Sequence, residues 1–123
     1  MKIDIEMRKS TEEATDIKNY ICKVGLTAIL DQKNTQHFET FILTLINGGL
    51  RKLLLDLSEL KHIDSSGIGK IINISKCIRK MKGNITITKC NPDVNKTLKL
   101  VKLGNFVSIF ASNDEGFNYL ALI

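Results

Sequence analysis

The chain has 123 residues, and its 18 Lys and Arg against 13 Asp and Glu give a formal net charge of +5. The length suits one domain over residues 1–123, and 43% hydrophobic with 25% charged residues argues against disorder. A single Pro and eight Gly exclude a collagen-like chain. No apolar run approaches the ~20 residues that a membrane helix needs, so we expect no association with a membrane.

Two strands are predicted to open the fold. Residues 2–8 alternate charged side chains with Ile and Met, which is the period-two pattern of a strand with one buried face. Residues 9–18 are polar and indicate a surface connection, and residues 20–26 form the second strand. We therefore expect a β-hairpin with a long loop, followed by a polar break at residues 31–35.

A helix and a buried strand follow. The spacing i, i+3, i+4, i+7, i+8 of the apolar residues in segment 38–46 predicts an amphipathic helix, which Gly48 and Gly49 end. The short apolar run 53–57 comes after this helix, which favours a central strand buried on both faces.

The second half of the chain repeats this alternation. A helix is predicted from Ser66 to Met81 with Gly83 as its cap, and a strand at residues 85–88 follows. Asn91 and Pro92 open a third helix that runs to Gly104. A last strand covers residues 107–110, and a capping box at residues 112–115 starts a final helix with Phe117, Leu120 and Ala121 inward.

The predicted order is therefore ββαβαβαβα. Such alternation is typical of an α/β fold, here a mixed, mostly parallel sheet of about five strands with four helices and right-handed crossovers.

One segment between the central strand and the second helix carries candidate chemistry. It places Asp64, Ser65, Ser66 and Gly67 at a helix N-terminus, where free backbone N–H groups favour negative charge. In the simplest interpretation, Asp64 or Ser65 caps the helix and the glycines allow close packing.

Three functional interpretations compete with that simple one. A serine hydrolase is excluded, because Ile63 stands where a nucleophile elbow needs its first Gly, and His62 is too close in sequence to serve a triad. A dinucleotide loop is a weak match, since Gly67 and Gly69 lead to Ile72 in place of a third Gly. The third interpretation is a phosphoacceptor serine. A phosphate there would add negative charge, which the N-terminus of the helix can stabilise.

The residues at this point resemble a known family. The stretch Leu55–Gly69 (LDLSELKHIDSSGIG) is similar to the signature of the STAS family, the bacterial anti-sigma-factor antagonists. The resemblance continues through Lys82-Gly83, the helix opening at Asn91-Pro92, and residues 100–104. It covers nearly the whole chain in matching order and implies a single STAS-type domain.

The resemblance implies a partner switch and no enzyme, catalytic residue or cofactor. The unmodified protein would bind a serine-kinase anti-sigma factor, which then releases its sigma factor. The kinase would phosphorylate Ser65, and a PP2C-type phosphatase would reverse the change. The partner-binding residues implied are Asp31, Asp64, Ser65, Ser66 and Gly67. Asp31 belongs to a short run that resembles one in the family. This chain keeps the Asp of that run, but Ala28 and Ile29 stand where the family has Gly and Glu. The alternative role of Asp31 is to form a turn.

Two other functions stay open beside this one. A STAS-like module could bind a nucleotide or small anion at the same helix end, or serve as a subunit of a stress complex or transporter. Nucleic-acid binding through the basic charge is less favoured, since only seven aromatic residues are present, most at core-like positions.

The positive charge is unevenly distributed. Residues 66–102 hold nine Lys and Arg and one acid, Asp93, which gives 9 − 1 = +8, so the remainder of the chain carries 5 − 8 = −3. This excess favours a protein-docking face for an acidic partner on the helices that follow Ser65.

The N-terminus and the cysteines indicate a cytoplasmic protein. The acids Asp4 and Glu6 lie where a signal peptide would be apolar. Cys22, Cys77 and Cys90 cannot all pair with one another and lack the spacing of metal ligands, so we expect a reducing compartment and no metal site.

Overall fold

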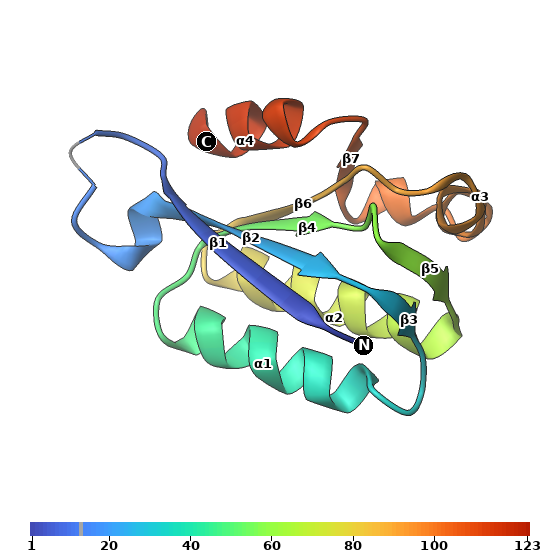
Figure 1. Cartoon of the computed structure of the whole chain (residues 1–123). Helices are drawn as coiled ribbons and strands as arrows, with labels where there is room; N and C mark the ends of the chain where they lie inside the picture. The colour runs from blue at the N-terminus through green and yellow to red at the C-terminus, as the bar shows by residue number, and fades with distance from the viewer. Residues whose placement is uncertain (13) are drawn as a thin grey trace.

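A five-stranded sheet lies at the centre of the computed structural model, which describes residues 1–12 and 14–123 (Figure 1). Its order is β1-β2-β4-β6-β7, with β1 antiparallel to β2 and the other pairs parallel. The predicted mixed, mostly parallel sheet is therefore confirmed. Glu13, in the predicted polar connection, lies outside the described residues. The strands are β1 (Ile3–Lys9), β2 (Tyr20–Leu26), β4 (Lys52–Asp56), β6 (Asn84–Thr88) and β7 (Ser108–Phe110).

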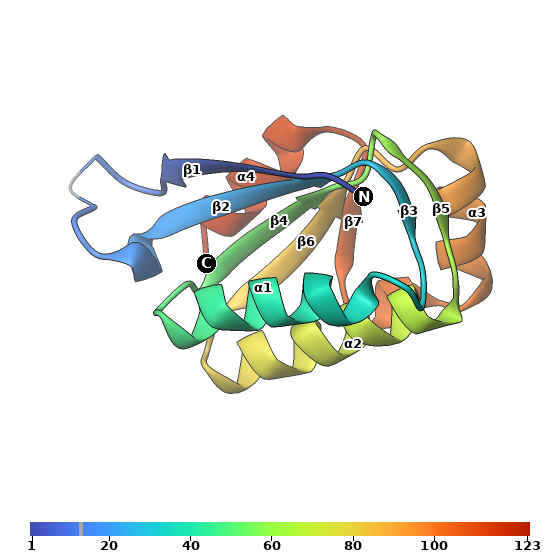
Figure 2. The same cartoon turned by 60° about the horizontal axis from the view of Figure 1, so that its bottom comes forward.

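The helices cover both faces of this sheet. Figures 1 and 2 show α1 (Thr35–Asn47) and α2 (Ser65–Lys80) side by side on one face and α4 (Asn113–Ala121) on the other, with α3 (Pro92–Leu100) at one end. Short 3-10 helices lie at Ile17–Asn19 and Leu103–Asn105. No helix in the described ranges is long and apolar enough to span a membrane.

The two faces bury cores of different size. On the α4 face, Ile21 and Leu54 of the sheet pack against Phe117 and Leu120. The α1–α2 face holds a much larger apolar cluster, which includes the whole inner side of both helices. Most of the stabilisation from apolar burial therefore comes from the face that carries α1 and α2.

Two short strands were missed by the sequence analysis. β3 (Ala28–Leu30) and β5 (Leu60–Ile63) form a separate parallel pair, which Figure 2 shows beyond the ends of β2 and β4. Three or four residues are too few for a recognisable alternation, and the register shifts between Ala28 and Ile29. This pair holds the segments that precede α1 and α2 next to each other.

Several predicted boundaries and orientations are corrected. The third helix ends at Leu100 and not at Gly104, because Lys102 adopts a left-handed conformation with φ of 56°. Lys82, and not the expected Gly83, adopts the left-handed conformation after α2, with φ of 63°. Gly83 is needed because the Arg51 carbonyl lies so close that a Cβ at this position would clash with it. Ala121, which was expected to face inward, is exposed.

The predicted helix starts agree with the structure. Asn91 accepts a hydrogen bond from the Val94 N–H at 2.9 Å, with Pro92 at the first helical position. Ser112 accepts one from the Glu115 N–H at 3.2 Å. These caps satisfy N–H groups that have no partner inside the helix.

The first strand is more exposed than its pattern predicted. Only Ile3 of the three apolar residues packs against the core, and Ile5 and Met7 remain 48% and 43% exposed. The expectation of a buried apolar face on β1 is therefore wrong, because neither α1 nor α2 covers this edge of the sheet.

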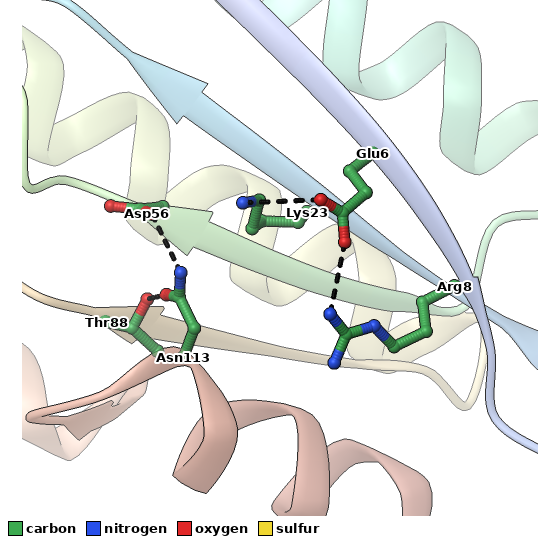
Figure 3. Close-up of polar contacts among 6 residues, drawn as sticks. All are labelled: Glu6, Arg8, Lys23, Asp56, Thr88 and Asn113. Atoms are coloured by element: carbon green, nitrogen blue, oxygen red, sulfur yellow. Dashed lines mark hydrogen bonds and ion pairs between the residues drawn. The ribbon is translucent and has the colours of Figure 1, made fainter.

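A polar cluster joins α4 to the ends of two strands (Figure 3). The amide of Asn113, at the start of α4, donates to the Asp56 carboxylate at 3.0 Å and accepts from the Thr88 hydroxyl. Burial alone would raise the pKa of Asp56, but hydrogen bonds from Asn113 and Ser58 and the charge of Lys89 lower it below its usual value. The folded state therefore favours the ionised carboxylate.

This lowered pKa predicts acid sensitivity. The stabilisation from Asp56 is present above its usual pKa of 3.8 and is lost as the pH falls through the lower folded-state value. Free energies of unfolding measured in denaturant across acid pH should therefore fall less steeply in Asp56→Asn than in the wild type. An equal slope in both proteins would contradict this role.

The left-handed Ala28 gives a second prediction. Its φ is 65°, which costs a residue with a Cβ about 1–2 kcal/mol, and the side chain is exposed. Glycine there avoids that cost but loses about 0.5–1 kcal/mol of chain entropy. Ala28→Gly should raise the melting temperature by about 2–4 °C. The control Ala121→Gly, in a helix, should lower it, and a lower melting temperature for Ala28→Gly would contradict the account.

Candidate functional site

The parallel strands β3 and β5 bring two predicted site residues together. Asp31 follows β3 and Asp64 follows β5, and parallel strands end at the same edge. The Asp64 N–H donates to the carbonyl of Leu30 at 3.2 Å, which continues the pairing past the strands. The turn before α1 and the N-terminus of α2 thus form one surface.

The carboxylate of Asp64 ties this surface together with three hydrogen bonds. One oxygen accepts from the Gly67 N–H at 3.0 Å and the Ser66 hydroxyl at 2.6 Å, and the other accepts from the Gln32 N–H at 3.2 Å. These bonds, the one from Ser66 foremost, lower the pKa of Asp64. Asp64 is the N-cap of α2, as one of the two sequence alternatives predicted.

Gly67 is required by a close contact. A Cβ at this position would lie 2.9 Å from the Leu30 carbonyl oxygen and 2.8 Å from a side-chain carbon of Ile63. Any larger residue would push α2 away from β3 and disturb the Gln32 contact. Gly69 has open space around it, so the predicted close packing holds for Gly67 alone.

The two serines of the motif have different roles. Ser66 is half-buried, and its hydroxyl donates to Asp64 within the cap. Ser65 is exposed as the first residue of α2, and the Asp64 cap does not use its hydroxyl. The sequence analysis named Asp64 or Ser65 as the cap and Ser65 as the phosphoacceptor, but it did not predict that the Ser66 hydroxyl joins the cap.

Asp31 has the turn-forming role considered as its alternative. Its carboxylate accepts from the Lys33 N–H at 3.0 Å, and its carbonyl accepts from the Asn34 and Thr35 N–H groups. The Asn34 side chain closes the turn by bonding the Asp31 N–H at 3.0 Å and the Ile29 carbonyl at 2.8 Å. Asp31 thus shapes the surface next to Asp64 and remains half-buried.

An apolar side chain also lies beside this surface. Ile29 of β3 is 42% exposed and pairs in register with His62 of β5, which is exposed too. His62 is a residue of the strand β5. The replacement of the family's Glu by Ile at position 29 was the signal that could have identified this exposed apolar side chain.

A buried carboxylate fixes α1 against α2. Glu39 of α1 is almost fully buried and accepts from Lys70 at 3.1 Å and from Asn73 at 2.8 Å, both on α2. This interaction holds the helix that begins at Ser65. Sequence reasoning missed it, because Glu39 lies on the flank of its helix and not on the apolar stripe.

Part of the predicted basic face lies on α3. A groove of about 430 Å³ runs along this helix, and a second of about 390 Å³ lies between it and β7. Lys99 and Asn95 line both, and Lys96 and the exposed Leu100 line the first. The helix α3 itself packs against β5, the strand that leads to Asp64 and Ser65 (Figure 2).

The cysteines offer no reactive thiolate at two of their three positions. Burial raises the pKa of both Cys22 and Cys90 to about 11, so their thiols stay protonated near neutral pH. Over the residues that the structure describes, His, Cys, Asp and Glu form no cluster of three or more that could hold a metal ion.

Comparison with known proteins identifies the family. The STAS domain profile matches residues 10–116, and the chain belongs to the STAS domain family. A relative from Thermotoga neapolitana that carries the name anti-sigma factor antagonist is 30% identical over 87 residues, or 70% of this chain and 77% of the relative. The family resemblance seen in the sequence is therefore confirmed.

Two solved structures show the same fold. The crystal structure of an anti-sigma factor antagonist from Thermotoga maritima gives a TM-score of 0.80 at 24% identity, and the match covers 96% of this chain and 93% of that one. The phosphorylated form of the Bacillus protein SpoIIAA gives a TM-score of 0.65 at 18% identity, covering 94% and 98%.

The distinct roles of the two serines predict distinct effects of their removal. Ser66→Ala removes the strongest hydrogen bond to the Asp64 carboxylate, so the pKa of Asp64 should rise toward its usual value. Ser65→Ala should leave that pKa unchanged. Titration of the Asp64 carboxyl carbon by NMR measures both, and an equal shift in the two variants would contradict the assigned geometry.

Proposed function

We propose that this protein is an anti-sigma factor antagonist that works by partner switching. The unphosphorylated form binds a serine-kinase anti-sigma factor, which then releases its sigma factor. Phosphorylation of Ser65 abolishes this binding. The protein itself carries out no catalysis and acts in the cytoplasm as a single STAS domain.

The observation that carries this proposal is the exposure of Ser65 at the first position of α2. The Asp64 cap already occupies Ser66, so Ser65 presents the motif hydroxyl that a kinase can reach. In the transfer, the Ser65 oxygen takes the γ-phosphoryl group of ATP, the hydroxyl loses its proton, and ADP leaves.

The charge added by phosphorylation explains the switch. A phosphoserine carries about −1.5 to −2 charges, and the free N–H groups at the start of α2 favour such charge, so the domain stays folded. The same charge lies beside the Asp64 carboxylate on the surface around Ile29. A partner seated there would have to bury unpaired negative charge, which costs about 2–5 kcal/mol.

The partners follow from this mechanism. The anti-sigma factor kinase contacts Asp31, Asp64, Ser65, Ser66 and Gly67 together with Ile29. The lysines on α3, Lys96 and Lys99, add an electrostatic contact for an acidic part of the partner. A PP2C-type phosphatase removes the phosphate and restores binding.

The test is the affinity for the cognate anti-sigma factor kinase, measured by calorimetry with Ser65→Asp and Ser65→Asn. The two variants have nearly equal shape and differ in charge, so their comparison isolates the electrostatic effect. Ser65→Asp should weaken binding by roughly 30-fold or more, which corresponds to the lower end of the cost above. Ser65→Asn should bind within a few-fold of the wild type. Equal affinities of the two variants would contradict the switch.

A further inference from the structure

The outer edge of β1 is an unpaired strand edge at the border of the sheet. The carbonyl of Lys2 accepts from Thr27 at 3.1 Å and the N–H of Ser10 donates to Asn19 at 2.8 Å, so even-numbered residues direct their backbone groups toward β2. The odd-numbered residues from Ile3 to Lys9 therefore point their N–H and C=O groups away from the sheet. β1 ends the strand order, so no described strand pairs with these groups.

This edge lacks several common protections against pairing. Its seven residues contain no Pro, and they pair one-to-one with β2 without a bulge. Natural edge strands are usually shortened, bulged, interrupted by Pro, covered by another element or protected by charged side chains, and of these β1 has the charges alone. Here the strand is among the longest of the sheet, and Ile5 and Met7 expose apolar surface on the face that α1 leaves uncovered.

The charges on the opposite face of β1 are self-complementary. Residues 4, 6 and 8 are Asp, Glu and Arg. Glu6 forms ion pairs with Arg8 at 3.3 Å and with Lys23 at 3.6 Å (Figure 3). Two copies of β1 that overlap over their full length in antiparallel orientation meet about Glu6. In that register Asp4 faces Arg8 of the second copy, and Ile5 faces Met7.

Neither neighbouring register matches the full overlap. A shift of the two-fold axis to Met7 would pair Glu6 with Arg8 but shorten the overlap to residues 5–9 and place Ile5 opposite Lys9. A shift of the two-fold axis to Ile5 would place Asp4 opposite Glu6 and Lys2 opposite Arg8, so like charges would meet. Full overlap instead creates two Asp–Arg pairs and two Ile–Met pairs. Its one like-charge contact, between the two Glu6 side chains, is offset by the Arg8 and Lys23 that each Glu6 already contacts.

We propose that β1 is a homodimer interface, in which two copies of this chain pair antiparallel about Glu6 and join their sheets into one of ten strands. The partner is a second copy of this chain, because in this orientation Asp4 faces Arg8 of the second copy and Ile5 faces Met7. The residues of the Ser65 surface lie outside β1, so this interface uses none of the residues of the proposed switch.

The test is sedimentation equilibrium of the whole chain over a concentration series. The wild type should show a monomer–dimer equilibrium. Asp4→Arg replaces two attractive contacts by two repulsive ones and should weaken dimerisation about tenfold. The double variant Asp4→Arg/Arg8→Asp restores opposite charges in this register and should recover most of that loss.

Control variants separate this result from a general effect of charge or folding. Asp114→Arg makes the same charge change on the exposed surface of α4 and should dimerise like the wild type. Circular dichroism verifies that each variant is folded. A wild type that stays monomeric throughout the series would overturn the proposal, as would a double variant that dimerises no better than Asp4→Arg. These measurements do not involve the anti-sigma factor kinase, so their outcome is independent of the test of the proposed switch.

Discussion

The candidate site depends on one carboxylate, that of Asp64. It accepts from the N–H of Gln32, the N–H of Gly67 and the hydroxyl of Ser66, so it joins the turn before α1 to the first turn of α2. The contact is possible because β3 and β5 end side by side and because Gly67 has no side chain against Leu30. One interaction thus fixes where α2 begins and which serine faces the solvent.

The electrostatics of this end of the fold suit a switch driven by charge. The start of α2 favours an added phosphate, whereas the Asp64 carboxylate beside it already contributes negative charge to the surface. In the proposed switch, Lys96 and Lys99 of α3, the helix that packs against β5, would supply an electrostatic contact for an acidic part of the partner. In the proposed switch, one modification would therefore leave the fold stable and weaken the binding of the partner.

The sequence predicted the parts of the structure that depend on local patterns. Apolar periodicity located α1 and α2, and the capping residues Asn91 and Ser112 located the starts of α3 and α4. It could not predict β3 and β5, because their three or four residues acquire a strand conformation only by pairing with each other. Nor could it show that Ser66 joins the cap, or that Ile5 and Met7 stay exposed, since both depend on how separate segments pack.

The assignment of the two serines is the central claim, and site mapping of the phosphate tests it most directly. The wild type and Ser66→Ala are incubated with the cognate kinase and ATP, and the modified peptide is sequenced by tandem mass spectrometry. The geometry predicts one phosphate per chain in both proteins, located on Ser65. Phosphate on Ser66 of the wild type, or modification of Ser65→Ala to the wild-type extent, would contradict it.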